Sequence, residues 1–574
     1  MKNPEKLYVL TLSGGETPQA YDEAALAACL QGIYNRGNGP AIYLLSEKNP
    51  TPKYWLDKFA SELKDSQTGW LCNREIVNLA SIDELCALVK PFVKKAIIWD
   101  EDVDASFNAA FTIAGVEDGV VLSPSYAEMI CPALGIGGDN IIDLRGKFTG
   151  EISGSKKNDV YLWAVENYLA KGLCSKHWLC LYSDPFKMRE TGDISYIVTR
   201  DWCVYNRAFV YDLSPWGDEA PLDDPGQKPG RDLETYKIML AEQLNQTNGE
   251  NMTEIAGFFN FVKYSNVPGH EESRHEPVPT EWESVYIMSP YNCYQNTVAS
   301  DCYNQSLHSQ YPFKPIKQSR PSESETAELQ DSCYLGVQMC DYDSATPLYD
   351  FMYKHWDDPN RGKINLSWGI NPNLIETYPD IITYFYETAV KNKDVFVADA
   401  SAAGYFNPSR IQNKYWDMVV NHNKHFYALT DMTMTPMVLD WEILSDKSLD
   451  RLTGFSPDGL SSIIMNFHAD SQEDMFNIPQ KIKVHNGVMV DEMLNHICNG
   501  GPVDEIADWF ARSVLSGDTP DKPAFHYIRI VWQNPSYIID LINALKKLRP
   551  ELDIQLVNTY DYFRLHKQHI LESQ

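Results

Sequence analysis

The sequence predicts an α/β protein in two parts, a layered α/β domain followed by a (β/α)8-like barrel of the TIM type. Three observations support this prediction. The chain has 574 residues, which is more than one hydrophobic core usually supports. Hydrophobic residues make up 44% of it and charged residues 22%, as in ordinary globular proteins. Short apolar or β-branched runs alternate with helix-like stretches, the pattern of βα units.

The first domain is predicted over residues 1–213. Strand-like and helix-like runs alternate within it, with strands expected at 7–12, 41–45, 96–99 and 120–122 and helices at 22–35 and 105–115. This alternation favours a doubly wound sheet covered by helices. Residues 214–232 are rich in proline, glycine and aspartate, and such a stretch continues neither helix nor sheet. We therefore expect an interdomain linker at 214–232.

The second domain is predicted over residues 233–574. Eight strand-like runs recur in it with helix-like stretches between them, at 255–259, 284–288, 334–339, 364–368, 395–398, 436–439, 462–465 and 527–531. Eight alternating units predict a (β/α) barrel. A ninth run at 554–557 leaves room for a variant of that barrel.

The charge balance restricts the partners. Aspartate and glutamate (79) outnumber lysine and arginine (49), giving a formal charge of −30. This acidic balance opposes the counterion release that drives nucleic-acid binding, so no nucleic-acid partner is expected. A neutral substrate, or simply solubility, fits the acidic surface.

Other signals concern compartment and cofactors. The twelve cysteines include no C-x-x-C pair, and no apolar run approaches the ~20 residues of a membrane span. We expect a soluble chain with no membrane partner, cytoplasmic as it stands, or periplasmic or secreted if a leader was removed. No phosphate-binding loop or G-x-S-x-G motif is present, and no cofactor or metal is expected. The acidic run 100–102 and the His422/His425 pair are interpreted as structural, and the oligomeric state is left open.

Carboxylates follow several predicted strands, where a barrel carries its reacting groups. Asp341 and Asp343 follow the run 334–339 in the segment Cys-Asp-Tyr-Asp-Ser. Further candidates follow or precede other runs: Asp399, Asp440, Glu442 and, just before the run 284–288, Glu281. Hydrolysis of a glycosidic bond requires one carboxyl group to protonate the leaving oxygen and a second to attack the sugar or to activate water.

We expect Asp341 or Asp343 to act with a second acid from another element, with Glu281 as the first choice and Asp399 or Glu442 in reserve. Two other interpretations stay open. Asp343 or Ser344 can cap a helix that begins nearby, and paired aspartates can bind a hard cation.

Five segments carry a family resemblance. Residues 402–408 read Ala-Ala-Gly-Tyr-Phe-Asn-Pro, and the other segments are 30–36, 106–115, 278–282 and 340–344. Together they resemble the family named for its G-x-G-Y-x-Y-P motif, described as "putative glycoside hydrolases". The resemblance implies an N-terminal α/β domain, a barrel-like domain bearing the site, and a carbohydrate substrate. Gly404, Tyr405 and Pro408 match the motif.

Small residues in such a motif let backbone approach a ligand, and Tyr405 offers a ring and a hydroxyl. Alanine disfavours positive φ, so the loop must differ from the glycine version if residue 402 requires positive φ there. The residues expected to contact substrate are Trp368, Asp399, Ser401, Gly404, Tyr405, Asp440 and Glu442.

The sequence thus predicts a glycoside hydrolase that uses paired carboxylates. Departures from the family pattern at Tyr342, Ser344, Ala402 and Asn407 prompt an alternative, a carbohydrate-binding protein without catalysis. The Asp-x-Asp pair prompts another, a metal-dependent sugar-modifying enzyme.

Overall fold

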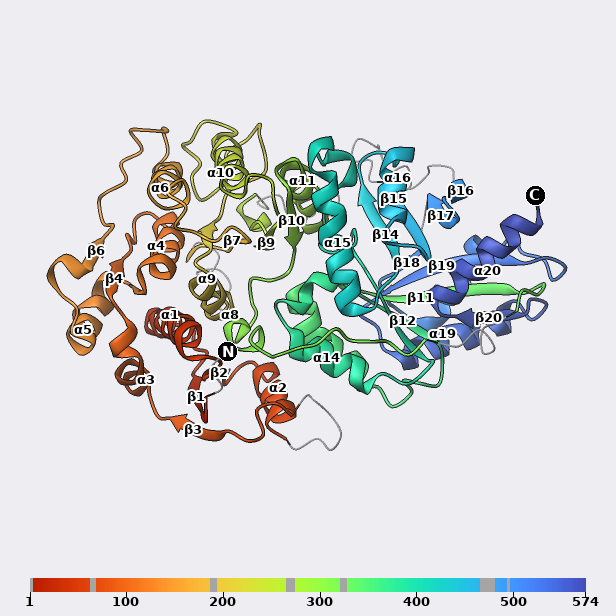
Figure 1. Cartoon of the computed structure of the whole chain (residues 1–574), viewed down its shortest axis with the longest axis horizontal. Helices are drawn as coiled ribbons and strands as arrows, with labels where there is room; N and C mark the ends of the chain where they lie inside the picture. Colours follow the sequence, from red (N-terminus) through yellow and green to blue (C-terminus); the bar gives the residue numbers. More distant parts are fainter. Residues whose placement is uncertain are drawn as a thin grey trace. The chain divides into compact units, whose positions relative to one another are not determined.

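The structure, a computed structural model, describes residues 4–61, 69–185, 194–264, 274–320, 328–464, 481–492 and 496–574 (Figure 1). The chain forms two compact units. Unit 1 comprises Met1–Pro312 with Glu376–Asp380, and unit 2 comprises Phe313–Ile375 with Ile381–Gln574. Among the described residues, no helix is both long and apolar enough to cross a bilayer.

The described residues of unit 1 form three small parallel sheets. Their orders are β2-β1-β3, β5-β4-β6 and β10-β9-β7-β8. The strands are β1 (Lys6–Leu12), β2 (Ile42–Ser46), β3 (Glu75–Leu79), β4 (Lys95–Ile98), β5 (Gly119–Leu122), β6 (Ile141–Asp143), β7 (Trp178–Leu181), β8 (Phe209–Tyr211), β9 (Thr253–Gly257) and β10 (Cys293–Asn296). The helices are α1 (Pro18–Asn38), α2 (Thr51–Ala60), α3 (Ile82–Val89), α4 (Ala105–Glu117), α5 (Pro124–Leu134), α6 (Lys156–Ala164), α8 (Ser195–Val198), α9 (Arg200–Asn206), α10 (Arg231–Thr247), α11 (Pro277–Met288) and α12 (Gln305–His308).

Helix α1 explains why these strands do not form the expected doubly wound sheet. Thr17 caps its N-terminus by accepting a hydrogen bond from Ala20 N, and the helix ends at Gly39, which has φ 84°. Its residues from Ala24 to Ile33 are buried on every side, as in a helix at the centre of a core. It packs against β2, β5 and α9, which belong to or connect the strands of three different sheets. The helix occupies the interior that one continuous sheet would cross.

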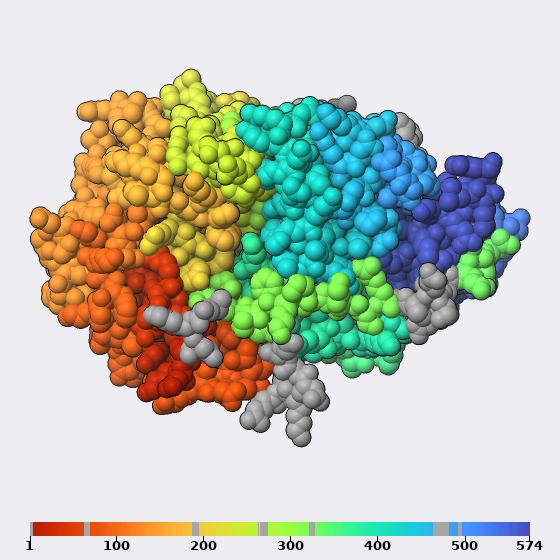
Figure 2. Space-filling model, in the orientation of Figure 1, coloured from red at the N-terminus to blue at the C-terminus, as the bar shows by residue number. Residues whose placement is uncertain are grey.

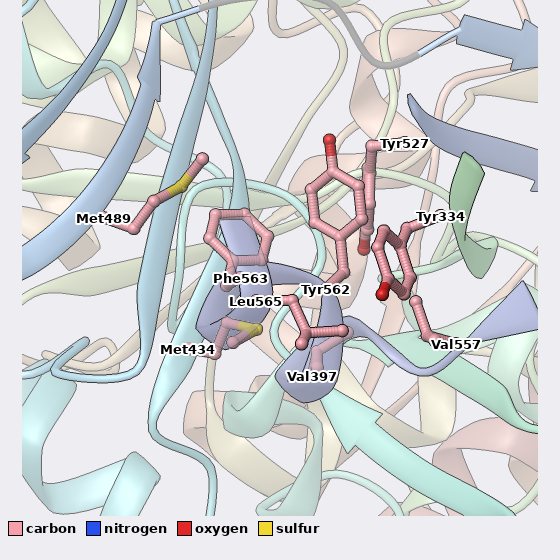
Figure 3. Close-up of a cluster of buried hydrophobic side chains, with 9 residues drawn as sticks. All are labelled: Tyr334, Val397, Met434, Met489, Tyr527, Val557, Tyr562, Phe563 and Leu565. Carbon is pink, nitrogen blue, oxygen red and sulfur yellow. The ribbon is translucent and has the colours of Figure 1, made fainter. Parts of the chain in front are cut away.

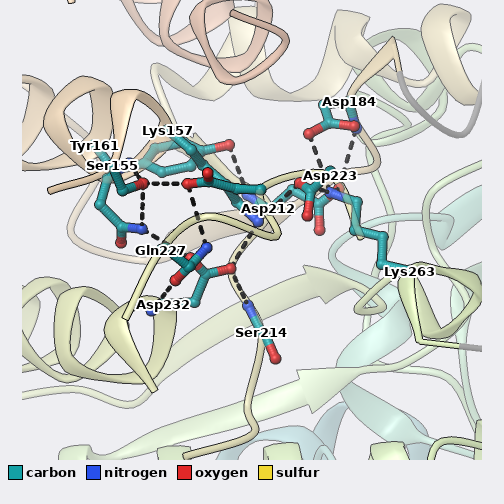
Figure 4. A network of polar contacts seen from close by, with 12 residues as sticks. Ser155, Lys157, Tyr161, Asp184, Asp212, Ser214, Asp223, Gln227, Asp232 and Lys263 are labelled. Atoms are coloured by element: carbon teal, nitrogen blue, oxygen red, sulfur yellow. Dashed lines mark hydrogen bonds and ion pairs between the residues drawn. The ribbon is translucent and has the colours of Figure 1, made fainter. Parts of the chain in front are cut away.

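The predicted linker is an anchored part of unit 1. Lys263 Nζ lies 2.8 to 3.0 Å from carboxylate oxygens of Asp184, Asp212 and Asp223, and Lys157 Nζ lies 2.6 to 2.8 Å from Asp232 and Asp223 (Figure 4). All six side chains are at least 94% buried. Charged side chains are buried this completely only when they are paired with opposite charges.

Because Asp223 and Asp232 take part in this network, it holds the proline-rich segment 214–232 inside unit 1. The prediction of a domain boundary at 214–232 is therefore wrong, since β9 and β10 follow that segment and join the sheet of β7 and β8. The units separate instead after Pro312.

Two sheets are formed by the part of unit 2 that the structure describes. One has the order β13-β12-β11-β19-β18, with β20 also paired to β11, and the other has the order β14-β15-β17-β16. The strands are β11 (Cys333–Tyr342), β12 (Leu366–Ile370), β13 (Asp394–Val397), β14 (Met434–Asp440), β15 (Gly459–Ile464), β16 (Lys481–His485), β17 (Val488–Glu492), β18 (His496–Cys498), β19 (Ala524–Val531) and β20 (Ile554–Val557). The helices are α13 (Met352–Trp356), α14 (Pro379–Thr388), α15 (Trp416–Thr430), α16 (Asp446–Thr453), α18 (Val503–Trp509), α19 (Pro535–Leu548) and α20 (Thr559–Glu572).

Six of the eight runs predicted as barrel strands form strands of unit 2, and the other two lie in unit 1. The run 255–259 corresponds to β9 of unit 1, and the run 284–288 is the end of helix α11. The other six runs lie on β11, β12, β13, β14, β15 and β19, although residue 465 falls outside the described part. All pairings between these strands are parallel.

The C-terminal helix α20 packs against both sheets of unit 2. Its Tyr562 and Phe563 belong to a buried cluster with Tyr334, Val397, Met434, Met489, Tyr527, Val557 and Leu565 (Figure 3). A Cβ on Gly336 of β11 would lie 2.8 Å from the Tyr562 ring, and one on Gly459 of β15 would lie 2.5 Å from the Phe563 ring. Glycine in each sheet thus makes room for this helix, so that α20 joins the two sheets through side-chain packing.

Residues 313–320 run in an extended path along the outside of unit 2 (Figure 2). Ile316 N donates to Leu429 O at 2.9 Å, and the Gln318 amide bonds to the backbone of Phe396 and Asp431. These contacts fix the segment to the layer formed by α15 and β13.

Candidate active site

The carboxyl ends of the parallel strands β11, β12 and β19 lie at one edge of the larger sheet of unit 2. Asp341 is the ninth residue of β11, and Arg529 lies near the end of the adjacent strand β19. Asp399 follows β13 by two residues. This edge is where parallel α/β proteins place their reacting groups.

Asp341 occupies a bulge at the end of β11. The register between β11 and β12 shifts between Met339 and Tyr342, and Asp341 has φ 66°, which L-residues other than Asn and Asp seldom adopt. Its N–H donates to Asp399 Oδ2 at 2.8 Å, and its carbonyl accepts from Trp532 Nε1 at 2.9 Å. The bulge breaks the alternation that would place the side chains of Asp341 and Asp343 on one face.

The Asp341 side chain is ion-paired and partly accessible. Its Oδ1 accepts from Arg529 Nη2 at 2.8 Å, while 37% of the side chain remains exposed. Arg529 itself is 91% buried. A buried guanidinium therefore holds a carboxylate that solvent, and hence a substrate, can reach.

Asp399 is the end of a buried hydrogen-bond chain. Tyr527 OH donates to Gln338 Oε1 at 2.7 Å, and Gln338 Nε2 donates to Asp399 Oδ1 at 2.8 Å. The second oxygen of Asp399 accepts from Asp341 N. Gly369 on β12 makes room for this chain, because a Cβ there would lie 2.3 Å from Gln338 Nε2 and 2.8 Å from Asp399 Oδ2.

The environment raises the pKa of two carboxyl groups. Burial raises the pKa of Asp399 to about 7, although Arg529 opposes the change, and the charge of Asp341 adds to it. Burial also raises the pKa of Asp343 well above its ordinary value, and the charges of Asp399 and Asp341 raise it further. Three carboxyl groups beside one guanidinium therefore favour the retention of a proton at this edge near neutral pH.

Asp343 is partly exposed, and its Oδ1 accepts from Ser344 Oγ at 3.3 Å. The following helical segment begins at Ala345, directly after Ser344, and Leu348 N donates to Ser344 O at 3.2 Å. Side-chain capping of this helix by Asp343 or Ser344 stays a prediction.

The segment 401–405 adopts positive φ at three positions, of which one is a glycine. Ser401, Ala402 and Gly404 have φ values of 55°, 90° and 98°. Ala402 thus adopts the positive φ that alanine disfavours. Ser401 N donates to Met437 O at 2.9 Å, which ties the segment after β13 to β14. Tyr405 is only 1% exposed, so its ring packs in the core of the loop.

Three other expected substrate residues lie in different surroundings. Asp440 is fully buried and accepts from Ser409 N and Trp441 N at 2.7 Å, which fixes neighbouring loops. Glu442 is exposed. Trp368 is fully buried beside Trp356, and its indole N–H donates to Asp394 Oδ1 at 3.0 Å. The structure thus places Asp440 and Trp368 in the packed interior.

Glu281 lies on helix α11 of unit 1 and is partly buried. The prediction had placed it just before a strand of the same domain as Asp341. A helical position in the other unit does not match that expectation, because the apolar run after it is helical.

Sequence reasoning missed two residues of this edge, Arg529 and Trp532. Trp532 directly follows β19, has φ 47°, and exposes 40% of its surface. Its ring packs edge-to-face against Phe351, with the ring centroids 4.9 Å apart. Its indole N–H donates to the Asp341 carbonyl. Both residues belong to or follow the predicted strand 527–531, so a search of strand ends for basic and aromatic residues would have found them.

Carboxyl groups gathered at the ends of parallel strands define a class of α/β proteins with a strand-edge site. The chain belongs to the GxGYxYP family. Residues 331–567 match the model "GxGYxYP putative glycoside hydrolase C-terminal domain", residues 6–68 match the first N-terminal domain, and residues 93–173 match the second.

A solved structure shares this fold. It is the crystal structure of a "putative hydrolase" from Bacteroides thetaiotaomicron, with a TM-score of 0.72 and 15% sequence identity over 99% of this chain and 95% of that one. At this identity the likeness concerns the fold. No match was found among curated proteins.

Proposed function

We propose that this protein is a glycoside hydrolase whose site lies at the end of β11, with Asp343 as proton donor and Asp341 as the second reacting carboxylate. One observation carries the proposal. The bulge at Asp341 presents an ion-paired, partly exposed carboxylate two residues from a carboxyl group with a raised pKa. Glycosidases need this combination of one protonated and one ionised acid.

Asp343 suits the role of general acid because a raised pKa keeps its proton available near neutral pH. Protonation of the glycosidic oxygen by Asp343 lets the aglycone leave as an alcohol. Asp341 then attacks the anomeric carbon directly or accepts a proton from the attacking water. Arg529 donates to Asp341 Oδ1 at 2.8 Å and so holds this carboxyl group in position.

Asp399 acts as a positioning residue in this proposal. It is fully buried, and both of its oxygens already accept hydrogen bonds, from Gln338 and from the Asp341 backbone. It therefore holds Asp341 in its left-handed conformation, which costs about 1–3 kcal/mol without such support.

Trp532 supplies an apolar surface for a sugar ring beside the acids. Its exposed indole is held in place by Asp341 O and Phe351. A rigid aromatic face with little freedom left to lose suits the C–H face of a pyranose. An acidic site in a chain of charge −30 further favours a neutral over an anionic sugar.

We also propose that the two sheets of unit 2 serve as a barrel-like scaffold. In such a barrel the strands would run in the order β18-β19-β11-β12-β13 and continue with β14-β15-β17. The hydrogen bond from Ser401 N to Met437 O supports the placement of β14 next to β13.

The test is a screen of aryl glycosides and of plant and host glycans with the full chain and three variants. We expect Asp343→Asn and Asp341→Asn each to lower kcat/KM by at least roughly 100-fold, the scale of general acid–base catalysis. Asp350→Asn, which neutralises a partly exposed carboxylate paired with Lys354, is the matched control and should leave activity unchanged.

Hydrolysis that survives Asp343→Asn would contradict the assignment of residues. Glycan binding without turnover by the wild type would instead identify a carbohydrate-binding protein. Turnover that a chelator abolishes, and that added divalent metal restores, would identify a metal-dependent enzyme.

A further inference from the structure

A second cluster of reactive side chains lies at the opposite end of the same strands. Cys333 is the first residue of β11, His526 is the third of β19, and Asp518 lies in the turn before β19. One ligand atom from each residue lies within 4.8 Å of the other two. From Cys333 to Asp341 is eight strand residues, or about 26 Å at the rise of a β-strand, so this cluster is separate from the proposed active site.

The geometry points to a metal site, and we propose that Cys333, Asp518 and His526 bind one zinc ion. Cys333 Sγ lies 3.6 Å from Asp518 Oδ2. In a tetrahedral zinc site, sulfur at ~2.3 Å and oxygen at ~2.0 Å from the ion lie about 3.5 Å apart. His526 Nε2 and Asp518 Oδ2 are 2.7 Å apart and would separate by roughly 0.6 Å to bind the same ion.

The ligand types select zinc among divalent ions. A thiolate with an imidazole and a carboxylate suits zinc, whereas magnesium and calcium prefer oxygen ligands alone. Cys333 is buried, while Asp518 and His526 are partly exposed. An ion can therefore enter from the side of Asp518 and His526, where water can supply the fourth ligand.

The surrounding structure holds the Asp518 turn in place. Arg549 Nη2 donates to Asp518 O at 3.0 Å, and Asp518 N donates to Leu515 O at 3.2 Å. Residues that orient the ligands of a metal in this way contribute to its affinity. Because the cluster joins the first residues of β11 and β19, bound zinc would stabilise unit 2 and leave catalysis unaffected.

The experiment uses the full chain after chelator treatment and dialysis, titrated with Co²⁺ alone and then with Zn²⁺. We expect one Co²⁺ per chain with a thiolate-to-cobalt charge-transfer band, its displacement by Zn²⁺, and a zinc-dependent rise in Tm. Cys333→Ser should abolish the band and weaken zinc binding at least roughly 10-fold, since even outer-shell changes cost that much.

His526→Gln should weaken zinc binding similarly while it retains the thiol, which provides a second test if Cys333→Ser folds poorly. The matched control is His485→Gln. His485 also contacts a carboxylate, Asp450, at 2.7 Å but belongs to no group that could hold a metal among the described residues, and its loss should change nothing. A wild type without the thiolate band, or a band that persists in Cys333→Ser, would overturn the proposal.

Discussion

Replacement of Gly369 by alanine tests whether the chain from Tyr527 to Asp341 positions the proposed site. The new Cβ would lie 2.3 Å from Gln338 Nε2, a separation that no carbon–nitrogen contact tolerates, so Gln338 must move. Gln338 then loses its bond to Asp399, and a bond to a charged group contributes about 1.5–3 kcal/mol. We expect a loss of stability of that size, measured by denaturant unfolding. A misplacement of Asp341 by ~1 Å would also lower kcat about 100-fold.

The double variant Gly369→Ala/Gln338→Ala separates this mechanism from general damage. Removal of the Gln338 amide relieves the closest contact, while the 2.8 Å contact with Asp399 Oδ2 remains. The Gly369→Ala change should therefore cost less stability in the Gln338→Ala background than in the wild type, with a coupling energy of up to about 1.5–3 kcal/mol. Gly517→Ala is the control, because its Cβ would meet nothing within 4 Å. Additive losses, or a Gly369→Ala enzyme of wild-type stability and activity, would refute the reasoning.

Four further predictions concern single residues. Lys263→Met removes the cation shared by three buried carboxylates, of which Asp223 keeps its pairing with Lys157, and should destabilise unit 1 by about 3–5 kcal/mol in urea unfolding. The pKa of Asp399 is raised from 3.8 to about 7, so between these two pH values the folded state binds a proton that the unfolded state has lost. The free energy of unfolding should therefore fall as the pH rises from 3.8 to about 7, and Asp399→Asn should remove this dependence. Trp532→Ala should raise KM roughly tenfold with little change in kcat, because ring stacking contributes about 0.5–1.5 kcal/mol beyond burial. Trp509 is also exposed, and Trp509→Ala should change neither KM nor kcat. Ala402→Gly should stabilise the protein by about 1 kcal/mol in thermal unfolding, and a loss of stability would contradict the φ of 90°.

The strands of unit 2 were largely predictable because parallel strands buried on both faces appear as continuous apolar runs. The run 284–288 shows the limit of that signal, since a short buried run fits the end of a helix equally well. The proline pair at 277 and 279 marked the helix start, because proline is favoured in the first turn.

The segment 214–232 shows a second limit. Its aspartates look like solvated loop residues, yet Asp223 and Asp232 pair with lysines distant in sequence. Local composition carries no information about such partners. The same holds for Asp399 and Asp440, whose positions after strands were predicted but whose complete burial depends on tertiary packing.

The departures from the family motif acquire a physical meaning at Ala402. The backbone there keeps the left-handed conformation that glycine adopts without strain, so tertiary contacts such as Ser401 N to Met437 O must outweigh the cost of the alanine. Asp341 is a similar case, held at positive φ by Asp399 and Trp532. Strain kept after two strands of one sheet, β11 and β13, and supported by buried hydrogen bonds, argues that this edge is maintained for function.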